Sequence, residues 1–434
     1  MISNGTGNGA PRSADTPTDM TPPRYAVDGR EPSVIARPAS LDDLAAALRD
    51  AHAAGQAVIP WGAGSQMALG AMPSRYDVAL DLSGLDAIVE HDAPNLTITA
   101  QAGARLSSLQ AALAEAGQFL PLDPAYPEAT IGGLIATDAS GGWRLGYGTL
   151  RDLVLGVRLV LADGTVLKLG GKTMKNVAGY DLIKPVVGSL GTLGVVAEAT
   201  LRAYAHPPVS RTLSVFTFPD PDKAAALTAR ILDLRFGPTA LDIFSSAEGA
   251  YIVLARLEGE PEAVDALAAN IETLAHAIPW LRVQVTETAA SQELWRAAGT
   301  GGAYWNGPQV SYAVVARVGI PIAAVGAFLA DARALTNRFD VPRLVTMHAG
   351  SGAGYVHLGA LRNQTTVEAL AEAALALRAV AETHGGHVVL AAAPSQVKAR
   401  VPVWGATAAH DLMAEIKRQL DPMDTLNPGR FIVS

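Results

Sequence analysis

A glycine-rich turn that runs directly into an apolar strand places the strongest constraint on this chain. Residues 188–196 read GSLGTLGVV. Glycine adopts backbone angles that other residues avoid, and because it has no Cβ, backbone N–H groups can come close to a bound group. We therefore expect Gly194, Val195 and Val196 to offer main-chain contacts to a bound group, while the valine side chains serve the core.

A second glycine loop lies near the start of the chain. Residues 59–70 read IPWGAGSQMALG, a strand end followed by the loop. Successive backbone N–H groups in such a loop form a nest that binds anions, and the Ser65 hydroxyl adds a donor. The loop has no Lys followed by Ser or Thr, so it is not a Walker P-loop, and the chain has no GxGxxG that joins a strand to a helix with an acid further on. The candidate contacts are Gly62, Ala63, Gly64, Ser65 and Gln66.

Composition narrows the possible functions. With 434 residues and 49% apolar content, the chain is expected to form two or three folding units. Its net charge of −8 argues against a nucleic-acid partner. The chain has no cysteine, so any iron–sulfur cluster held by cysteines must belong to a partner subunit. Apolar runs such as residues 318–330 stop short of bilayer length, which predicts no transmembrane segment and a cytoplasmic location, with any membrane association made through partners.

The first half of the chain is predicted to be one α+β domain. Residues 1–24 are rich in Gly, Ser, Thr and Pro and are expected to form a disordered tail. Residues 25–207 follow, with two lobes at about 25–90 and 91–207. Helical spacing after Ser40 and a hairpin at Asp163 and Gly164 belong to these lobes.

The second half has a different pattern, which begins after His206, Pro207 and Pro208. Residues 208–400 show the order strand, helix, strand, strand, helix, strand twice in succession. Two βαββαβ units of this kind predict an antiparallel sheet covered by helices. Residues 401–434 contain a last amphipathic helix and are expected to return to the first domain.

Together these motifs resemble the FAD-binding domain of the vanillyl-alcohol oxidase family, also called the PCMH type. The segments LPLDPAYPEATIGGLIATDASGGWRLGYGTLRDLVLG, at 120–156, and DPMDTLNPGRF, at 421–431, occur in the order of that family. The resemblance implies FAD as cofactor, bound noncovalently because the first loop lacks histidine and the chain lacks cysteine. It adds the candidate contacts Trp61, Thr130, Ile131, Gly132, Gly133, Thr137, Ser140, Gly141, Tyr147 and Gly148, each of which could also be a packing residue.

Within this family the chain resembles the E-type FAD-binding subunit of bacterial glycolate oxidase. That resemblance implies an FAD-dependent oxidoreductase that oxidises a 2-hydroxy acid, glycolate to glyoxylate, and passes electrons to a related flavoprotein subunit and an iron–sulfur subunit. Two alternatives stay open. The chain could be a self-sufficient FAD-dependent dehydrogenase of a hydroxy acid or alcohol, or a noncatalytic flavin-binding assembly subunit.

The substrate residues are less well defined by the sequence. Related dehydrogenases carry two metal-binding histidines in an HxGDGNxH-like segment, whereas residues 348–357 here read HAGSGAGYVH. No catalytic residue and no metal site are therefore assigned; His348 is a candidate base, and His348 with His357 are candidate metal ligands, with structural histidines as the alternative. A substrate carboxylate could be held by Arg296, Arg317 or Arg362, although solvated or ion-paired arginine is the default.

Overall fold

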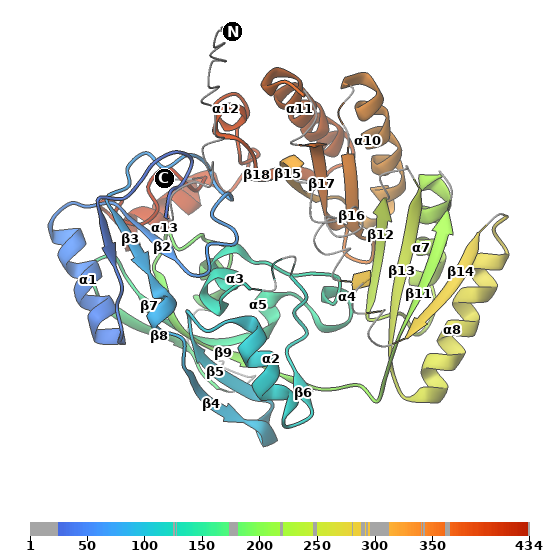
Figure 1. Ribbon diagram of the computed structural model, residues 1–434, viewed down its shortest axis with the longest axis horizontal. Coiled ribbons are helices and arrows are strands. Elements are labelled where there is room, and N and C mark those ends of the chain that lie inside the picture. Colours follow the sequence, from blue (N-terminus) through green and yellow to red (C-terminus); the bar gives the residue numbers. More distant parts are fainter. Residues whose placement is uncertain are drawn as a thin grey trace, which may run out of the picture.

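The structure of the chain is a computed structural model. It describes residues 25–432 except 125, 127, 173–180, 218–219, 246–249, 280, 288–290, 292–293, 296–311, 340, 342 and 361–364. The expected tail at residues 1–24 and the candidates Arg296 and Arg362 lie outside the described residues. The predicted α+β fold class is confirmed. The first half of the chain contains helices with small sheets, and the second half contains one large antiparallel sheet (Figure 1).

A small parallel sheet begins the chain. Its strands β1 (Val34–Ala36), β2 (Val58–Trp61) and β3 (Val78–Asp81) lie in the order β1-β3-β2. Helix α1 (Leu41–Ala53) connects β1 to β2 and begins at Ser40, whose hydroxyl accepts a hydrogen bond from the Asp43 N–H at 3.1 Å. Strand β2 ends at Trp61, so the first glycine loop starts at the end of a buried strand.

A second, antiparallel sheet completes the first half. Its strand order is β4-β5-β9-β7-β8, and hydrophobic residues from both sheets share one core. The turn that begins at Gly188 leads into β9, which pairs with β5 and β7 in the middle of this sheet. The elements are β4 (Ile88–Asp92), β5 (Thr97–Gln101), α2 (Leu106–Ala114), β6 (Gln118–Phe119), α3 (Ile131–Thr137), α4 (Arg144–Tyr147), α5 (Leu150–Leu153), β7 (Val154–Val160), β8 (Val166–Gly170), α6 (Ile183–Val186), β9 (Val195–Arg202) and β10 (Tyr204–Ala205).

The second half is an antiparallel sheet with helices packed against it, as predicted. The described strands form an eight-stranded sheet in the order β14-β11-β13-β12-β16-β17-β15-β18. Each βαββαβ unit supplies four adjacent strands. The first unit consists of β11 (Val209–Thr217), α7 (Pro221–Leu232), β12 (Ala240–Ser245), β13 (Tyr251–Gly259), α8 (Pro261–His276) and β14 (Arg282–Glu287); the second consists of β15 (Tyr312–Gly319), α10 (Val325–Phe339), β16 (Arg343–His348), β17 (Ala353–Ala360), α11 (Val367–Thr383) and β18 (His387–Ala392).

The two units join between β12 and β16. These strands pair antiparallel, and Asp242 lies directly opposite His348 in the register. The helices of both units pack on the sheet around a second apolar core, which includes Phe328 and Leu377. Because the units meet edge to edge, two residues more than a hundred positions apart in sequence become neighbours on one face of the sheet.

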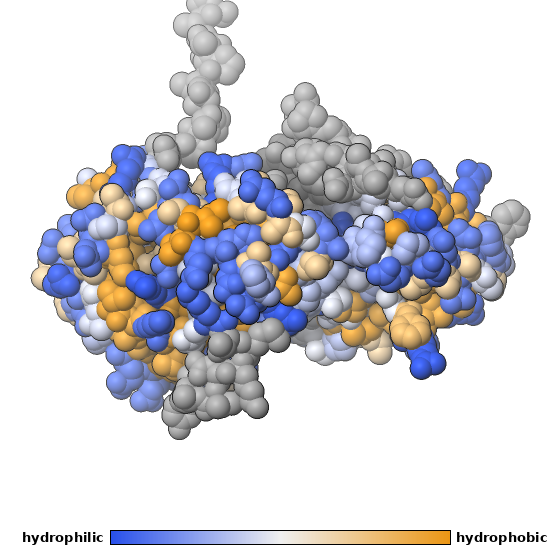
Figure 2. Space-filling model, turned by 90° about the horizontal axis from the view of Figure 1, so that it is seen from below, coloured by the Kyte–Doolittle hydropathy of each residue, from blue (hydrophilic) through white to orange (hydrophobic). Residues whose placement is uncertain are grey.

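The C-terminal residues return to the first sheet. After α12 (Ser395–Lys398) and α13 (His410–Leu420), the Val58 N–H of β2 donates to the Thr425 carbonyl at 2.8 Å, and the Asn427 N–H donates to the Val58 carbonyl at 2.9 Å. Figure 1 accordingly shows the red end of the chain beside the blue strands β2 and β3. Figure 2 shows the molecule from below, where hydrophobic patches lie mainly over its left half and are separated by hydrophilic surface.

Candidate functional site

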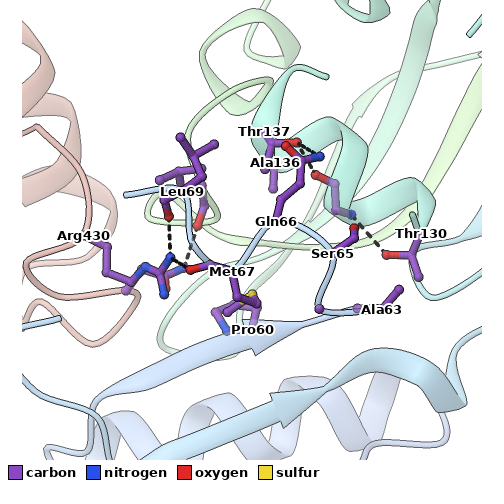
Figure 3. Close-up of a pocket in the computed structure, with 15 residues that line it drawn as sticks. Pro60, Ala63, Ser65, Gln66, Met67, Leu69, Thr130, Ala136, Thr137 and Arg430 are labelled. Carbon is purple, nitrogen blue, oxygen red and sulfur yellow. Dashed lines mark hydrogen bonds between the residues drawn. The ribbon is translucent and has the colours of Figure 1, made fainter. Parts of the chain in front are cut away.

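A pocket lies where the loop after β2 meets the start of helix α3. The loop supplies residues 62–67, and α3 supplies its first and last turns (Figure 3). Both segments were predicted to contain ligand contacts, the loop from its glycines and the start of α3 from the family resemblance, and the fold brings them to the same place. The lining residues are Pro60, Gly62, Ala63, Gly64, Ser65, Gln66, Met67, Leu69, Thr130, Gly133, Ala136, Thr137, Leu190, Asn427 and Arg430.

Steric contacts explain why this loop needs glycine. A Cβ placed on Gly62 would lie 2.1 Å from the Thr130 hydroxyl oxygen, and Gly64 has a positive φ of 76°. Thr130 is the N-cap of α3, and its hydroxyl accepts a hydrogen bond from the Gly133 N–H at 3.3 Å. At the other end of α3, the Gln66 amide donates to the Thr137 hydroxyl at 3.0 Å. The loop and the helix are therefore held close together, with only backbone between them at Gly62.

A second pocket continues from the first around the turn that leads into β9. It is lined by Trp61, Gly132, Gly191, Gly194, Val195 and Val196, among others. The two pockets share Pro60, Gly62, Thr130, Gly133, Ala136 and Leu190 on their walls. All three predicted glycine segments thus border one elongated channel, which suits an extended dinucleotide better than a compact ligand.

The channel offers an anion few charges but many backbone donors. Its arginine, Arg430, is 3% exposed, and its Nη2 donates to the carbonyl oxygens of Met67 and Leu69. Burial lowers the pKa of Arg430 to about 10, which leaves the guanidinium charged at neutral pH. Its Nη1 is buried and has no hydrogen-bond partner among the described residues. A diphosphate would supply the missing acceptor, so the residues present fit FAD.

Sequence reasoning did not select Arg430 or Asn427 as site residues. Both belong to the LNPGRF segment, which carried part of the family resemblance, and this was the available signal. Their place in the pocket depends on the pairing of residues 425–427 with β2. Asn427 adopts a positive φ of 49°, and its amide reaches the Leu190 carbonyl on the turn before β9.

Other predicted contacts from the second segment do not line these pockets. Ile131 is buried in the core, and the Ser140 hydroxyl accepts from the Leu150 N–H at 3.2 Å. The Tyr147 hydroxyl donates to Glu258 at 3.1 Å. Gly141 packs against Asp123, and Gly148, which has a positive φ of 87°, packs against Asp152. The contacts of Ile131, Ser140, Gly141 and Gly148 thus lie within the first half of the chain, whereas Tyr147 contacts the second half through Glu258.

A third and larger cavity, of about 450 Å³, lies between the two halves of the chain. It shares Leu69, Thr137 and Leu190 with the first pocket. Its wall from the second half includes Arg317, and apolar side chains from the C-terminal segment, including Trp404 and Phe431, complete it. The cavity is therefore an extension of the channel toward the large sheet.

The candidate base His348 belongs to a buried charged cluster at the same junction. Its Nδ1 lies 3.0 Å from both carboxylate oxygens of Asp242, and its Nε2 is buried with no partner in the described part of the chain. Arg256 lies 4.0 Å from the Asp123 carboxylate. Burial raises the pKa of Asp123 to about 6. His348 is thus oriented through one nitrogen and free to accept a proton at the other.

The second histidine is not placed to share a metal with the first. In the β16–β17 register, His348 faces Ala353 and His357 faces Leu344, so the histidines are four rungs apart. At about 3.3 Å a rung this is roughly 13 Å, far longer than two metal–nitrogen bonds of about 2.1 Å. Burial lowers the pKa of His357 to about 4. The described residues contain no group of three or more His, Cys, Asp or Glu that could hold a metal ion.

Two family descriptions match the chain. Residues 32–170 match an FAD binding domain, and residues 207–390 match the C-terminal domain of FAD linked oxidases. These matches and the glycine-lined channel define an FAD-dependent oxidoreductase. The chain carries the domain pair of the FAD-linked oxidases, with FAD as its cofactor.

Several known proteins resemble this chain over different lengths. It is 28% identical to the D-lactate dehydrogenase of Archaeoglobus fulgidus over 95% of this chain and 94% of that protein. Over a shorter span, 31% of this chain and 39% of the relative, it is 43% identical to glycolate oxidase subunit GlcE of Escherichia coli. An alkyldihydroxyacetonephosphate synthase structure has a TM-score of 0.72 at 18% identity, over 92% of this chain and 77% of that one, which shows the shared fold.

Among the helices that the structure describes, none is both long enough and apolar enough to cross a bilayer.

Proposed function

We propose that this chain is the FAD-binding subunit of a glycolate oxidase-like complex, in which a 2-hydroxy acid is oxidised to the 2-oxo acid and electrons pass to partner subunits. Glycolate is the proposed substrate and glyoxylate the product. The observation that carries the proposal is the continuous channel formed by the three glycine segments. The likeness to a D-lactate dehydrogenase over almost the whole chain supports the substrate class, and the likeness to GlcE supports the complex.

The proposal assigns roles to residues along the channel. The diphosphate of FAD and the groups next to it would be held by Gly62, Ala63, Gly64, Ser65, Gln66, Thr130, Gly133 and Thr137. Trp61, Gly132, Gly194, Val195 and Val196 would surround the adenine. FAD, when bound, supplies the two-electron acceptor for the reaction. The proposed domains are 25–207 for FAD, 208–400 as a cap over the substrate, and 401–434 as the segment that returns to the FAD domain.

A second candidate is a self-sufficient FAD-dependent hydroxy-acid dehydrogenase. The Asp242–His348 pair favours it, because the imidazole is oriented by a buried carboxylate and keeps Nε2 free for a substrate proton. Only the first candidate needs a related flavoprotein subunit and an iron–sulfur subunit, which would take up its electrons.

One experiment separates the two candidates. The chain is purified alone and its visible spectrum is recorded, after which glycolate or D-lactate is added without oxygen. A flavin band near roughly 450 nm that stays unchanged supports a subunit that needs partners. A band that bleaches supports the self-sufficient dehydrogenase. If FAD reconstitution yields no flavin band at all, the cofactor assignment and both candidates fail.

A further inference from the structure

Two buried cations hold the glycine loop that follows β2 by its carbonyl groups. Lys398, in α12, donates from Nζ to the Ala68 carbonyl at 2.7 Å and to the Gly70 carbonyl at 3.0 Å. Arg430 donates to the two carbonyl groups that alternate with these, as Figure 3 shows. Four successive carbonyl groups, those of residues 67–70, therefore accept hydrogen bonds from side-chain cations.

Both cations come from parts of the chain that are distant from the loop in sequence. Lys398 lies just after β18, at the end of the second half, and Arg430 belongs to the C-terminal segment that pairs with β2. Lys398 is 7% exposed and Arg430 is 3% exposed, so solvent does not compete for their hydrogen bonds. The shape of the loop thus depends on how two later segments pack against it.

The charges around these two side chains do not balance. Lys398 Nζ lies 2.9 Å from a carboxylate oxygen of Asp28, whose side chain is 8% exposed. Arg430 forms no ion pair with a described residue, and its Nη1 is buried without a partner there. Burial, and to a smaller extent the charge of Arg430, lower the pKa of Lys398. Two buried cations beside one carboxylate leave a surplus positive charge, which is costly unless a ligand supplies the opposite charge.

The same loop is where the proposed function puts the diphosphate of FAD. Residues 62–67 and Arg430 line the pocket, whereas Lys398 lines none of the described pockets. Resting on that placement, we propose that Lys398 is a positioning residue for the diphosphate and acts on it through the loop. It holds the carbonyl groups of Ala68 and Gly70 toward its own ammonium group, so that these oxygens do not repel the phosphates. Its charge, together with that of Arg430, offsets the two negative charges of the diphosphate.

A second buried lysine provides a matched comparison. Lys417 is 3% exposed and donates to the carbonyl groups of Thr192 and Leu426. It also pairs with two carboxylates, those of Asp421 and Asp424, so its charge is balanced. None of these contacts involves the glycine loop. Removal of this lysine should therefore cost stability without a specific effect on phosphate binding.

The test compares the binding of ADP and of adenosine to the flavin-free full chain by isothermal titration calorimetry, without divalent cations. ADP has the adenine and diphosphate groups of FAD, and adenosine lacks the phosphates. Lys398→Met removes the charge and keeps the apolar stem, and Lys398→Arg keeps the charge. Asp28→Asn removes the carboxylate that offsets the two cations, and Lys417→Met is the control. Thermal unfolding and the FAD Kd are recorded for every variant.

We expect Lys398→Met to raise the ADP Kd by about tenfold or more, with little change in the adenosine Kd, because only the charged ligand loses a charge-assisted interaction. Lys398→Arg should recover most of the ADP affinity. Asp28→Asn should lower the ADP Kd although it destabilises the flavin-free protein, because the positive surplus grows. Lys417→Met should leave the ratio of the two Kd values unchanged.

Equal rises of the ADP and adenosine Kd in Lys398→Met would overturn the proposal and leave Lys398 a structural residue. Weaker ADP binding by Asp28→Asn would also overturn it, and this variant decides the case if Lys398→Met does not fold. If the wild type binds ADP no better than adenosine, the placement of the diphosphate fails and the proposal fails with it. If the expected pattern is found but neither glycolate nor D-lactate reduces the flavin with partner subunits present, the role of Lys398 stands and the proposed function fails.

Discussion

Asp242 and His348 face each other across the line where the two βαββαβ units join, and the imidazole Nδ1 lies 3.0 Å from both carboxylate oxygens. Asp242 is 1% exposed and His348 is 4% exposed, so solvent does not screen the contact. The pair therefore lies in the middle of the large sheet and is buried. We test its role in proton transfer by substituting each of its two residues.

Asp242→Asn should slow flavin reduction by the hydroxy acid without removing the flavin. The amide cannot stabilise a protonated imidazole, so loss of this contact is expected to cost about 100-fold in the rate. His348→Gln should cost at least as much. Rapid mixing under anaerobic conditions measures the rate, with the partner subunits present if the chain alone is inactive.

A surface pair provides the matched control for this prediction. His384 Nε2 lies 2.8 Å from the Asp331 carboxylate, and His384 lines none of the described pockets, so His384→Gln removes a similar contact outside the channel. Equal effects of His384→Gln and His348→Gln would show that the buried pair has only a structural role.

Gly62→Ala should weaken FAD binding. The new methyl group would lie 2.1 Å from the Thr130 hydroxyl, and Thr130 cannot move without losing its hydrogen bond to the Gly133 N–H. We expect the FAD Kd to rise at least tenfold, or about 1.4 kcal/mol, as measured by titration of flavin-free protein. Gly237→Ala is the control, because that glycine is exposed and no atom lies within 4 Å of its added Cβ. Equal affinities for the two variants would contradict the assigned loop contact.

Arg430→Met should lower both FAD affinity and stability. The change removes donors to the Met67 and Leu69 carbonyls and the buried Nη1 that is free to meet an anion. A cost of about 1 to 3 kcal/mol is expected from loss of charge-assisted hydrogen bonds. Thermal unfolding with and without FAD separates the two effects, and Arg418→Met, at an exposed position on α13, is the control. The FAD contact is refuted if the variant loses stability equally in both states.

Asp123→Asn should remove a pH dependence of stability. Burial raises the pKa of Asp123 to about 6, above its ordinary value of 3.8. The native state therefore holds this proton more tightly than the unfolded state, so the contribution favours folding below about pH 4 and is lost as the pH rises through 6. Relative to Asp123→Asn, the free energy of unfolding of the wild type should fall by about 3 kcal/mol across this range, because each pKa unit corresponds to about 1.4 kcal/mol. Denaturant unfolding at several pH values measures it.

Asp163 should show the opposite sign. The Thr165 N–H donates to its carboxylate at 2.8 Å and lowers the pKa of that group. Its contribution to stability is therefore present above the ordinary value of 3.8 and is lost as the pH falls toward its lowered folded pKa. Parallel pH curves for Asp123→Asn and Asp163→Asn would contradict both assignments.

Local sequence patterns predicted much of the fold. The Ser40 cap, the turn at Gly164 and the two βαββαβ units all depend on residues close in sequence, through hydrogen bonds and alternating apolar positions that a short segment contains. The glycine loops could also be predicted from the sequence, because backbone segments can approach closely at positions such as Gly62 and Gly194 only where no Cβ is present.

The chemistry of the junction was decided by the tertiary structure. Nothing in the local sequence around Asp242 or His348 indicates that they touch; the register between β12 and β16 puts them together. The sequence did not distinguish Arg317 from the two other candidate arginines. Its contacts with the carbonyls of Thr137 and Asp138 depend on the position of β15 in the fold. Sequence alone thus determined the elements and the glycine turns that line the pockets, whose causes are local, while the charged groups that meet between the two halves depended on long-range packing of the whole chain.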